Sequence, residues 1–138
     1  MRTIERAVVS VLGTILLVGS AAAADLTGAE LKTLLSGKSV YLQNTATSTA
    51  GAGQGVLYYA ADGTALYKTG SGKILHGTWT IKDNTSCITW KEQTTNPCSR
   101  YDKTGATVDT INVINVATGQ VRGKVIKIVD GNPEKIAP

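Results

Sequence analysis

Residues 75–90 read LHGTWTIKDNTSCITW, two runs of alternating apolar and polar residues on either side of Asp83-Asn84. A two-residue turn at Asp83-Asn84 pairs Gly77 with Trp90, so an indole ring lies over a glycine. The same register places the apolar residues of both runs on one face, as a single buried side requires. These residues are Leu75, Trp79, Ile81, Ile88 and Trp90. The opposite face carries His76 and mainly threonine.

Further strands extend this hairpin into a larger sheet. Besides residues 74–82 and 86–91, alternation and turn residues predict strands at 39–43, 56–60, 64–69, 98–103, 107–116 and 121–129. The turns are short and no helix intervenes, which indicates an antiparallel meander. We expect a mainly β fold, a small barrel or half-barrel of about eight strands. The apolar residues of the last two strands change parity, which predicts either a β-bulge or burial of both faces.

One short helix precedes the sheet. Residues 26–35 begin with a capping box formed by Thr27 and Glu30, and Gly37 is placed to end the helix. The leucines Leu31, Leu34 and Leu35 form one apolar face. A helix this short is not stable alone, so we expect it to pack on the sheet.

The first 24 residues have the pattern of an export signal. Arg2 and Arg6 are followed by the uncharged run 7–18, and Ala22 and Ala24 fit a signal-peptidase site before Asp25. Twelve residues are too few to span a bilayer core of ~30 Å. The sequence therefore predicts residues 1–24 as a signal peptide and 25–138 as one domain. We expect a periplasmic or secreted protein with no transmembrane segment after processing.

Charge and cysteine content narrow the class further. The chain has 14 basic and 10 acidic residues; without Arg2, Arg6 and Glu5 of the leader, 12 and 9 are left, a net charge of +3. These charges are scattered, unlike the basic stripe of a nucleic-acid-binding protein. Cys87 and Cys98 are the only cysteines, and an exported protein most simply pairs them in a disulfide. Their spacing fits neither a redox motif nor a zinc site.

The sequence offers little catalytic chemistry. His76 is the only histidine, and no motif places a nucleophile and a carboxylate beside it. We interpret it as a surface histidine, and we expect no metal and no cofactor. The glycine-rich run 51–55 is followed by a strand and not by a helix, so it is interpreted as a flexible linker and not as a phosphate loop.

Two groups of residues suggest an interaction surface. A two-residue turn at Asp62-Gly63 pairs Tyr58 with Tyr67 on one face of a hairpin. Packing of the N-terminal helix on that face is the ordinary interpretation, and an exposed tyrosine patch is the alternative. The second group is a basic outer side of the final strand, which the sequence also explains as protection of an edge strand. It consists of Arg122, Lys124 and Lys127.

Several motifs together carry a family resemblance. They are LTGAEL at 26–31, LYY at 57–59 with DG at 62–63, HGTW at 76–79, CITW at 87–90 and PCSRY at 97–101. The chain resembles a family of small exported alphaproteobacterial proteins classed as a domain of unknown function. The resemblance implies export and a compact β-rich domain, and it supplies no reaction and no catalytic residue. The pattern also resembles exported bacterial inhibitor barrels, at the level of the fold only.

Together these features predict a non-catalytic binding or interaction protein of the cell envelope, with an unknown envelope protein as its partner. Two alternatives stay open. One is a lipocalin-like carrier of a small apolar ligand, and the other is a protease-inhibitor-like barrel. The bulky residues of the 75–90 hairpin fill an eight-stranded barrel, so the carrier ranks lower. A cavity on the order of 300 Å³ or more would reverse that order.

Overall fold

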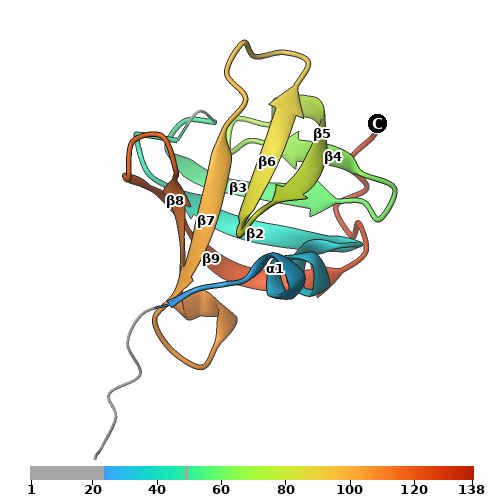
Figure 1. Cartoon of the computed structure of the whole chain (residues 1–138). Coiled ribbons are helices and arrows are strands. Elements are labelled where there is room, and N and C mark those ends of the chain that lie inside the picture. Colours follow the sequence, from blue (N-terminus) through green and yellow to red (C-terminus); the bar gives the residue numbers. More distant parts are fainter. Residues whose placement is uncertain (1–23, 49) are drawn as a thin grey trace, which may run out of the picture.

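The computed structural model describes residues 24–48 and 50–138. Eight strands, each antiparallel to its neighbours in the sequence, close into a barrel because β7 also pairs with β8 and β9 pairs with β2 (Figure 1). The predicted barrel of about eight strands is confirmed. The strands are β2 (Lys38–Asn44), β3 (Gly53–Tyr59), β4 (Thr64–Lys68), β5 (Ile74–Lys82), β6 (Thr85–Trp90), β7 (Cys98–Lys103), β8 (Ile111–Asn115) and β9 (Val121–Asp130).

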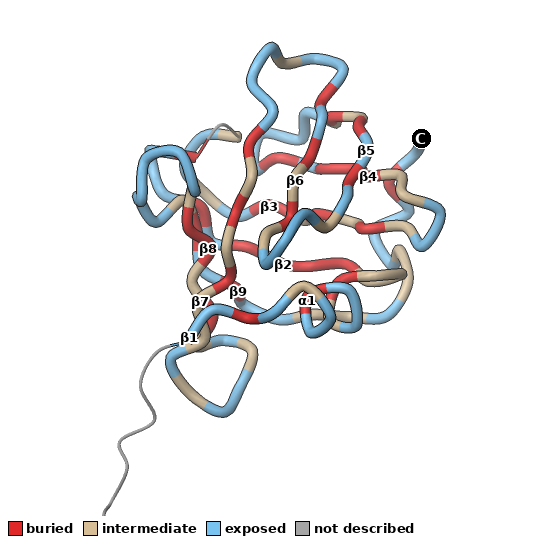
Figure 2. Tube along the Cα trace, viewed as in Figure 1, coloured by how far each residue is buried: buried red, intermediate tan, exposed pale blue. Residues whose placement is uncertain are grey.

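The β5–β6 hairpin has the predicted register. Gly77 pairs with Trp90 and Trp79 pairs with Ile88. A Cβ atom on Gly77 would stand 2.9 Å from the Trp90 ring, so the indole does lie over the glycine. Buried positions alternate with more exposed ones along β5 and β6 (Figure 2).

The β3–β4 hairpin differs from the prediction by one residue. Its loop has three residues, Ala61 to Gly63, because Ala60 and Thr64 are still joined by a backbone hydrogen bond of 2.8 Å. Gly63 has a φ of 94°, as a three-residue loop with a glycine bulge requires. Tyr67 therefore pairs with Leu57 on the inner face, while Tyr58 points outward.

The parity change in the last two strands comes from a β-bulge. Val113 pairs with Gly123 and Ile114 pairs with Val121, so Arg122 is the extra residue on β9. The strand β9 has a neighbour on both sides, β2 and β8. The explanation of its basic residues as edge protection was therefore wrong, because closure of the barrel leaves β9 no free edge.

One rim of the barrel is covered by the helix α1 (Gly28–Leu35). Thr27 caps the helix as predicted, with the Glu30 amide donating to Thr27 Oγ1 at 3.2 Å, while the Glu30 carboxylate accepts from the Thr27 hydroxyl at 3.0 Å. Leu31 and Leu35 are fully buried in the core. The Gly28 amide donates to Asn84 Oδ1 at 2.9 Å, which attaches the helix to the β5–β6 turn (Figure 1). A short strand, β1 (Ala24–Asp25), precedes it and pairs with the end of β7.

The helix does not cover the outer face of the β3–β4 hairpin, as the ordinary interpretation of that face expected. It contacts β2, β5 and β6 instead. The C-terminal segment after β9 runs along the outer face of β2, where Ser39 donates to the Gly131 carbonyl at 2.7 Å and Tyr41 donates to Glu134 at 2.9 Å. Its Ile136 is buried.

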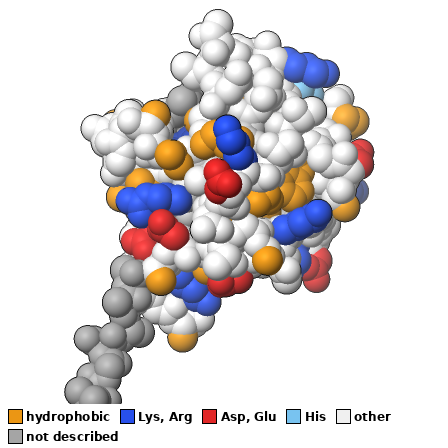
Figure 3. Space-filling model, viewed as in Figure 1, with side chains coloured by type: hydrophobic (Ala, Val, Ile, Leu, Met, Phe, Trp, Pro, Cys, Tyr) orange, Lys and Arg blue, Asp and Glu red, His pale blue; other side chains and the backbone are white. Residues whose placement is uncertain are grey.

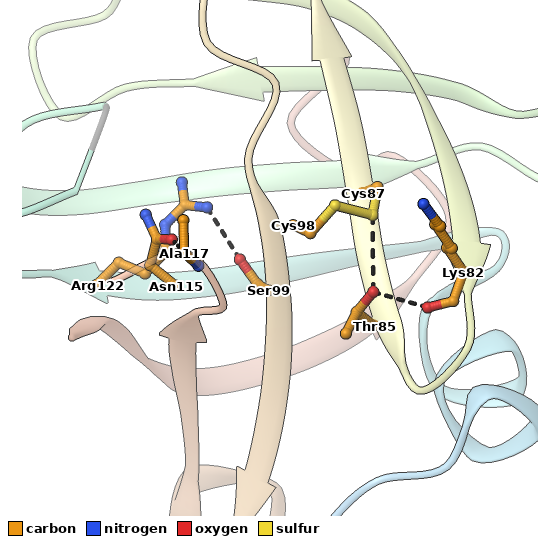
Figure 4. Close-up of a disulfide and its surroundings, with 8 residues drawn as sticks. All are labelled: Lys82, Thr85, Cys87, Cys98, Ser99, Asn115, Ala117 and Arg122. Carbon is orange, nitrogen blue, oxygen red and sulfur yellow. Dashed lines mark hydrogen bonds between the residues drawn. A yellow bond between two sulfur atoms is a disulfide. The ribbon is translucent and has the colours of Figure 1, made fainter. Parts of the chain in front are cut away.

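The predicted disulfide joins Cys87 of β6 to Cys98 of β7 on the outer face of the barrel (Figure 4). These two strands share only two residue pairs, Ser86 with Ser99 and Cys87 with Cys98. The connection between them forms the projecting loop at the top of Figure 1. The covalent bond therefore joins the two neighbouring barrel strands that share the fewest residue pairs.

The predicted signal segment lies outside the described residues, apart from Ala24. Within residues 24–48 and 50–138, no helix has the length and apolar character needed to cross a membrane. The strand predicted at 107–116 begins too early, because a 3₁₀ turn, η1 (Val108–Thr110), precedes β8.

Candidate functional site

A small chamber lies inside the barrel at the rim opposite α1. Its volume is about 40 Å³. Asn44 at the end of β2, Trp90 at the end of β6, Ser99 near the start of β7 and Arg122 near the start of β9 all line it. Antiparallel order brings these strand ends to the same rim. The space exceeds the ~10–15 Å³ that one water needs, and it is far below the ~300 Å³ of an ordinary small-molecule pocket.

Two tyrosines form the floor of the chamber. Tyr59 and Tyr101 are each 1% exposed, and their hydroxyl oxygens lie 2.6 Å apart. Burial raises the pKa of Tyr59, and it raises the pKa of Tyr101 well above 10, with the neighbouring Tyr59 adding to the effect. Both hydroxyls are therefore neutral at physiological pH. One of them donates to the other, so the pair has one further hydroxyl proton, and Ser86 Oγ lies close to Tyr59.

A third tyrosine, Tyr67, lines the chamber from β4. Its hydroxyl accepts a hydrogen bond from the side-chain amide of Asn44. Burial raises the pKa of Tyr67 as well, so it too carries a hydroxyl proton. The Tyr67 ring lies against Gly55, where any Cβ atom would overlap the hydroxyl. Gly55 belongs to β3, so the interpretation of the run 51–55 as a flexible linker was wrong for residues 53–55.

The chamber contains one permanent charge. Arg122, turned inward at the β8–β9 bulge, donates from Nη1 to Ser99 Oγ at 2.9 Å (Figure 4). Its positive charge acts on all three tyrosines, because it lowers the pKa of each against the larger effect of burial. None of the described residues that line the chamber is an aspartate or a glutamate.

A serine completes the polar lining. Ser86 Oγ on β6 is buried and has no hydrogen-bond partner of good geometry among the described residues. It nevertheless lies close enough to Tyr59 to help stabilise the ionised form of that hydroxyl. Buried hydroxyls are normally hydrogen-bonded, so this atom indicates a place where a bound water or ligand atom fits.

A second polar pair lies on the outer face, at His76. The Glu92 carboxylate contacts His76 Nδ1 at 2.5 Å and accepts from the His76 backbone amide at 2.8 Å. These two hydrogen bonds from His76 hold the pKa of Glu92 below its usual range. Sequence reasoning missed Glu92, because it lies beyond the end of β6. Among the described residues, no hydroxyl is hydrogen-bonded to the imidazole.

The predicted interaction surface is not a single surface. Tyr67 and Arg122 point into the barrel, which corrects their assignment to an outer face. Tyr58 is half-buried on the outside of β3. Lys124 and Lys127 are exposed on β9, where Lys127 Nζ lies 4.5 Å from the centroid of the Tyr41 ring. On the face shown in Figure 3, basic side chains are scattered among acidic and neutral ones.

Sequence reasoning also missed the polar inner residues. Ser86 has the same parity as Ile88 and Trp90, and Ser99 has the same parity as Tyr101. A polar residue at an inward position of an otherwise apolar strand was the sequence signal that could have identified them. That signal identifies single residues, but it does not show that they meet.

The described residues contain no group of three or more histidine, cysteine, aspartate or glutamate side chains placed to hold a metal. The chain matches no protein-family model, no curated protein and no solved structure. The resemblance to a family of small exported proteins therefore stays a prediction.

Proposed function

We propose that this protein is an exported, non-catalytic binding protein of the cell envelope, with the chamber as its ligand site. The observation that carries the proposal is a barrel with two different ends. Leu31 and Leu35 of α1 close one end with apolar side chains. At the other end, a small space is lined by neutral hydroxyls and Arg122 together with apolar side chains such as Leu57 and Ile88. The mouths of β-barrels are common sites of small-ligand binding.

Export is supported by two independent features. The first 24 residues have the order of a signal peptide, and the described part of the chain contains a disulfide and no free cysteine. Disulfides persist mainly in oxidising compartments. The test is to express the full chain in a bacterium and to sequence the N-terminus of the protein from each cell fraction. We expect a periplasmic or secreted form that begins near Asp25 and has no titratable thiol. A cytoplasmic form with an intact Met1 and two thiols would contradict the proposal.

The size of the chamber argues against an apolar carrier. An apolar ligand of ordinary size needs a much larger cavity than 40 Å³. Native mass spectrometry of the protein from its own cell fraction tests this point. A bound lipid or pigment of several hundred daltons would favour the carrier.

A protein partner is the second candidate function. Val116 and Val121 flank the β8–β9 turn and are 48% and 42% exposed. They lie at the same rim as Arg122, so a partner bound there would cover the chamber. Crosslinking in intact cells, compared between the wild type and a Val116→Ser, Val121→Ser double variant, tests this alternative. A crosslinked species that the double variant loses would support it.

A further inference from the structure

Some hydroxyl groups in the chamber carry protons for which no accepting atom is identified among the described residues. The Tyr59–Tyr101 pair uses one of its two hydroxyl protons, and Tyr67 accepts from Asn44 without using its own proton. The Ser86 hydroxyl, which lies close to Tyr59, has no hydrogen-bond partner of good geometry among the described residues. Unmade hydrogen bonds at buried groups are costly, so these donors favour a guest rich in acceptor atoms.

The described residues that line the chamber carry positive charge only. Arg122 contributes a guanidinium, and the described lining contains no carboxylate. Because burial raises the pKa of each chamber tyrosine, none of them provides a compensating negative charge at neutral pH. A cation would meet like charge here, whereas an anion would meet Arg122 of β9 and the hydroxyl donors of Tyr67 on β4 and Ser86 on β6.

Size and shape limit the anion. A chamber of about 40 Å³ accommodates only a few non-hydrogen atoms. The planar guanidinium presents parallel N–H donors that match the two oxygens of a carboxylate. We propose that the chamber binds a short carboxylate, held by Arg122 and by the tyrosine hydroxyls around it. This inference rests on the proposed use of the chamber as the ligand site.

The same carboxylate chemistry has two sources. One is a free small acid such as formate or acetate. The other is the carboxylate end of a longer chain, whose tail would extend beyond the chamber. Titration with sodium acetate and with sodium octanoate distinguishes them. Saturation by acetate identifies the free acid, and saturation by octanoate alone identifies the long chain.

The experiment titrates the purified protein with each sodium salt, against sodium chloride at equal ionic strength. Heat of binding and the fluorescence of Trp90, which lines the chamber, report occupancy. For a ligand of four non-hydrogen atoms we expect saturation at about millimolar concentration. Arg122→Met should abolish measurable binding. Its matched control is Lys124→Met, which removes the same charge two residues away on the outer face and should change the affinity by less than about twofold.

A second variant keeps the test valid if Arg122→Met does not fold. Tyr67→Phe removes one hydroxyl, has the same ring against Gly55, and should weaken binding about tenfold. Equal responses to acetate, octanoate and chloride would overturn the inference, because water alone would then fill the chamber. Equal losses in Lys124→Met and Arg122→Met would overturn it too, as a surface-charge effect. Neither outcome bears on export, which the N-terminal sequence and the thiol count decide.

Discussion

Removal of the disulfide gives the sharpest test of how this barrel is held closed. Cys87 and Cys98 are 11 residues apart and form one of only two residue pairs between β6 and β7. A crosslink that closes a loop of this length lowers the conformational entropy of the unfolded chain, and this stabilises the folded state by about 3 kcal/mol. For a domain of this size, that loss lowers the melting temperature by about 12 °C. The bond stands on the outer face, so replacing it by a Cys87→Ser, Cys98→Ser pair leaves no cavity in the core.

The assay is urea unfolding of the wild type and of the double serine variant, followed by tryptophan fluorescence, with the melting temperature as a second measurement. The control is Thr89→Ser, an exposed change two residues from Cys87 on the same face of β6, which should stay within about 0.5 kcal/mol of the wild type. Reduction of the wild type with a thiol reagent should reproduce the loss seen in the double variant. A double variant within 0.5 kcal/mol of the wild type would refute the reasoning, because the β6–β7 ladder would then close the barrel without the bond.

Three further outcomes are expected. Gly77→Ala should lower the free energy of unfolding by about 1–3 kcal/mol or more, since its Cβ would overlap the Thr89 carbonyl and press on the Trp90 ring; a fully stable alanine variant in a urea titration would contradict this. Glu92→Gln should destabilise the protein more at pH 7 than at pH 3. The pKa of Glu92 is lowered by folding, so its stabilisation is present above the unfolded value near 4.5 and is lost as the pH falls through the folded value; an equal effect at both pH values would disprove the role of the His76 pair. The chamber tyrosines have raised pKa values, so their contribution to stability is complete below about pH 10 and is lost at higher pH. Their tyrosinate absorbance should therefore rise only together with unfolding, and early titration of all five tyrosines would count against their burial.

Much of the fold could be predicted from local pattern. The 75–90 hairpin specified its own register, because two runs of period two agree on one inward side only when Trp79 faces Ile88. Thr27 and Glu30 marked the start of α1, since capping depends on residues three apart in the sequence. The disulfide followed from the number of cysteines in a chain with an export signal. Each of these inferences uses residues that are near one another or that have a single available partner.

Two of the errors concern which way a side chain points. At Asp62-Gly63 the turn has one residue more than the two-residue pattern, and this single residue moved Tyr67 from the outer face to the chamber. At the β8–β9 bulge one extra residue turned Arg122 inward. Alternation along a strand fixes only relative orientation, so one inserted residue reverses the side for every residue beyond it.

The amino-acid sequence by itself determined the strands, the capped helix, the crosslink and the short connections that make the meander. Tertiary structure alone decided that β9 joins β2, that α1 closes one rim, and that three tyrosines and Arg122 meet inside the other. The physical reason is distance along the chain. Hydrophobic periodicity and turn chemistry act over a few residues, whereas the chamber is assembled from residues 44 to 122, which become neighbours only when the last strand completes the barrel.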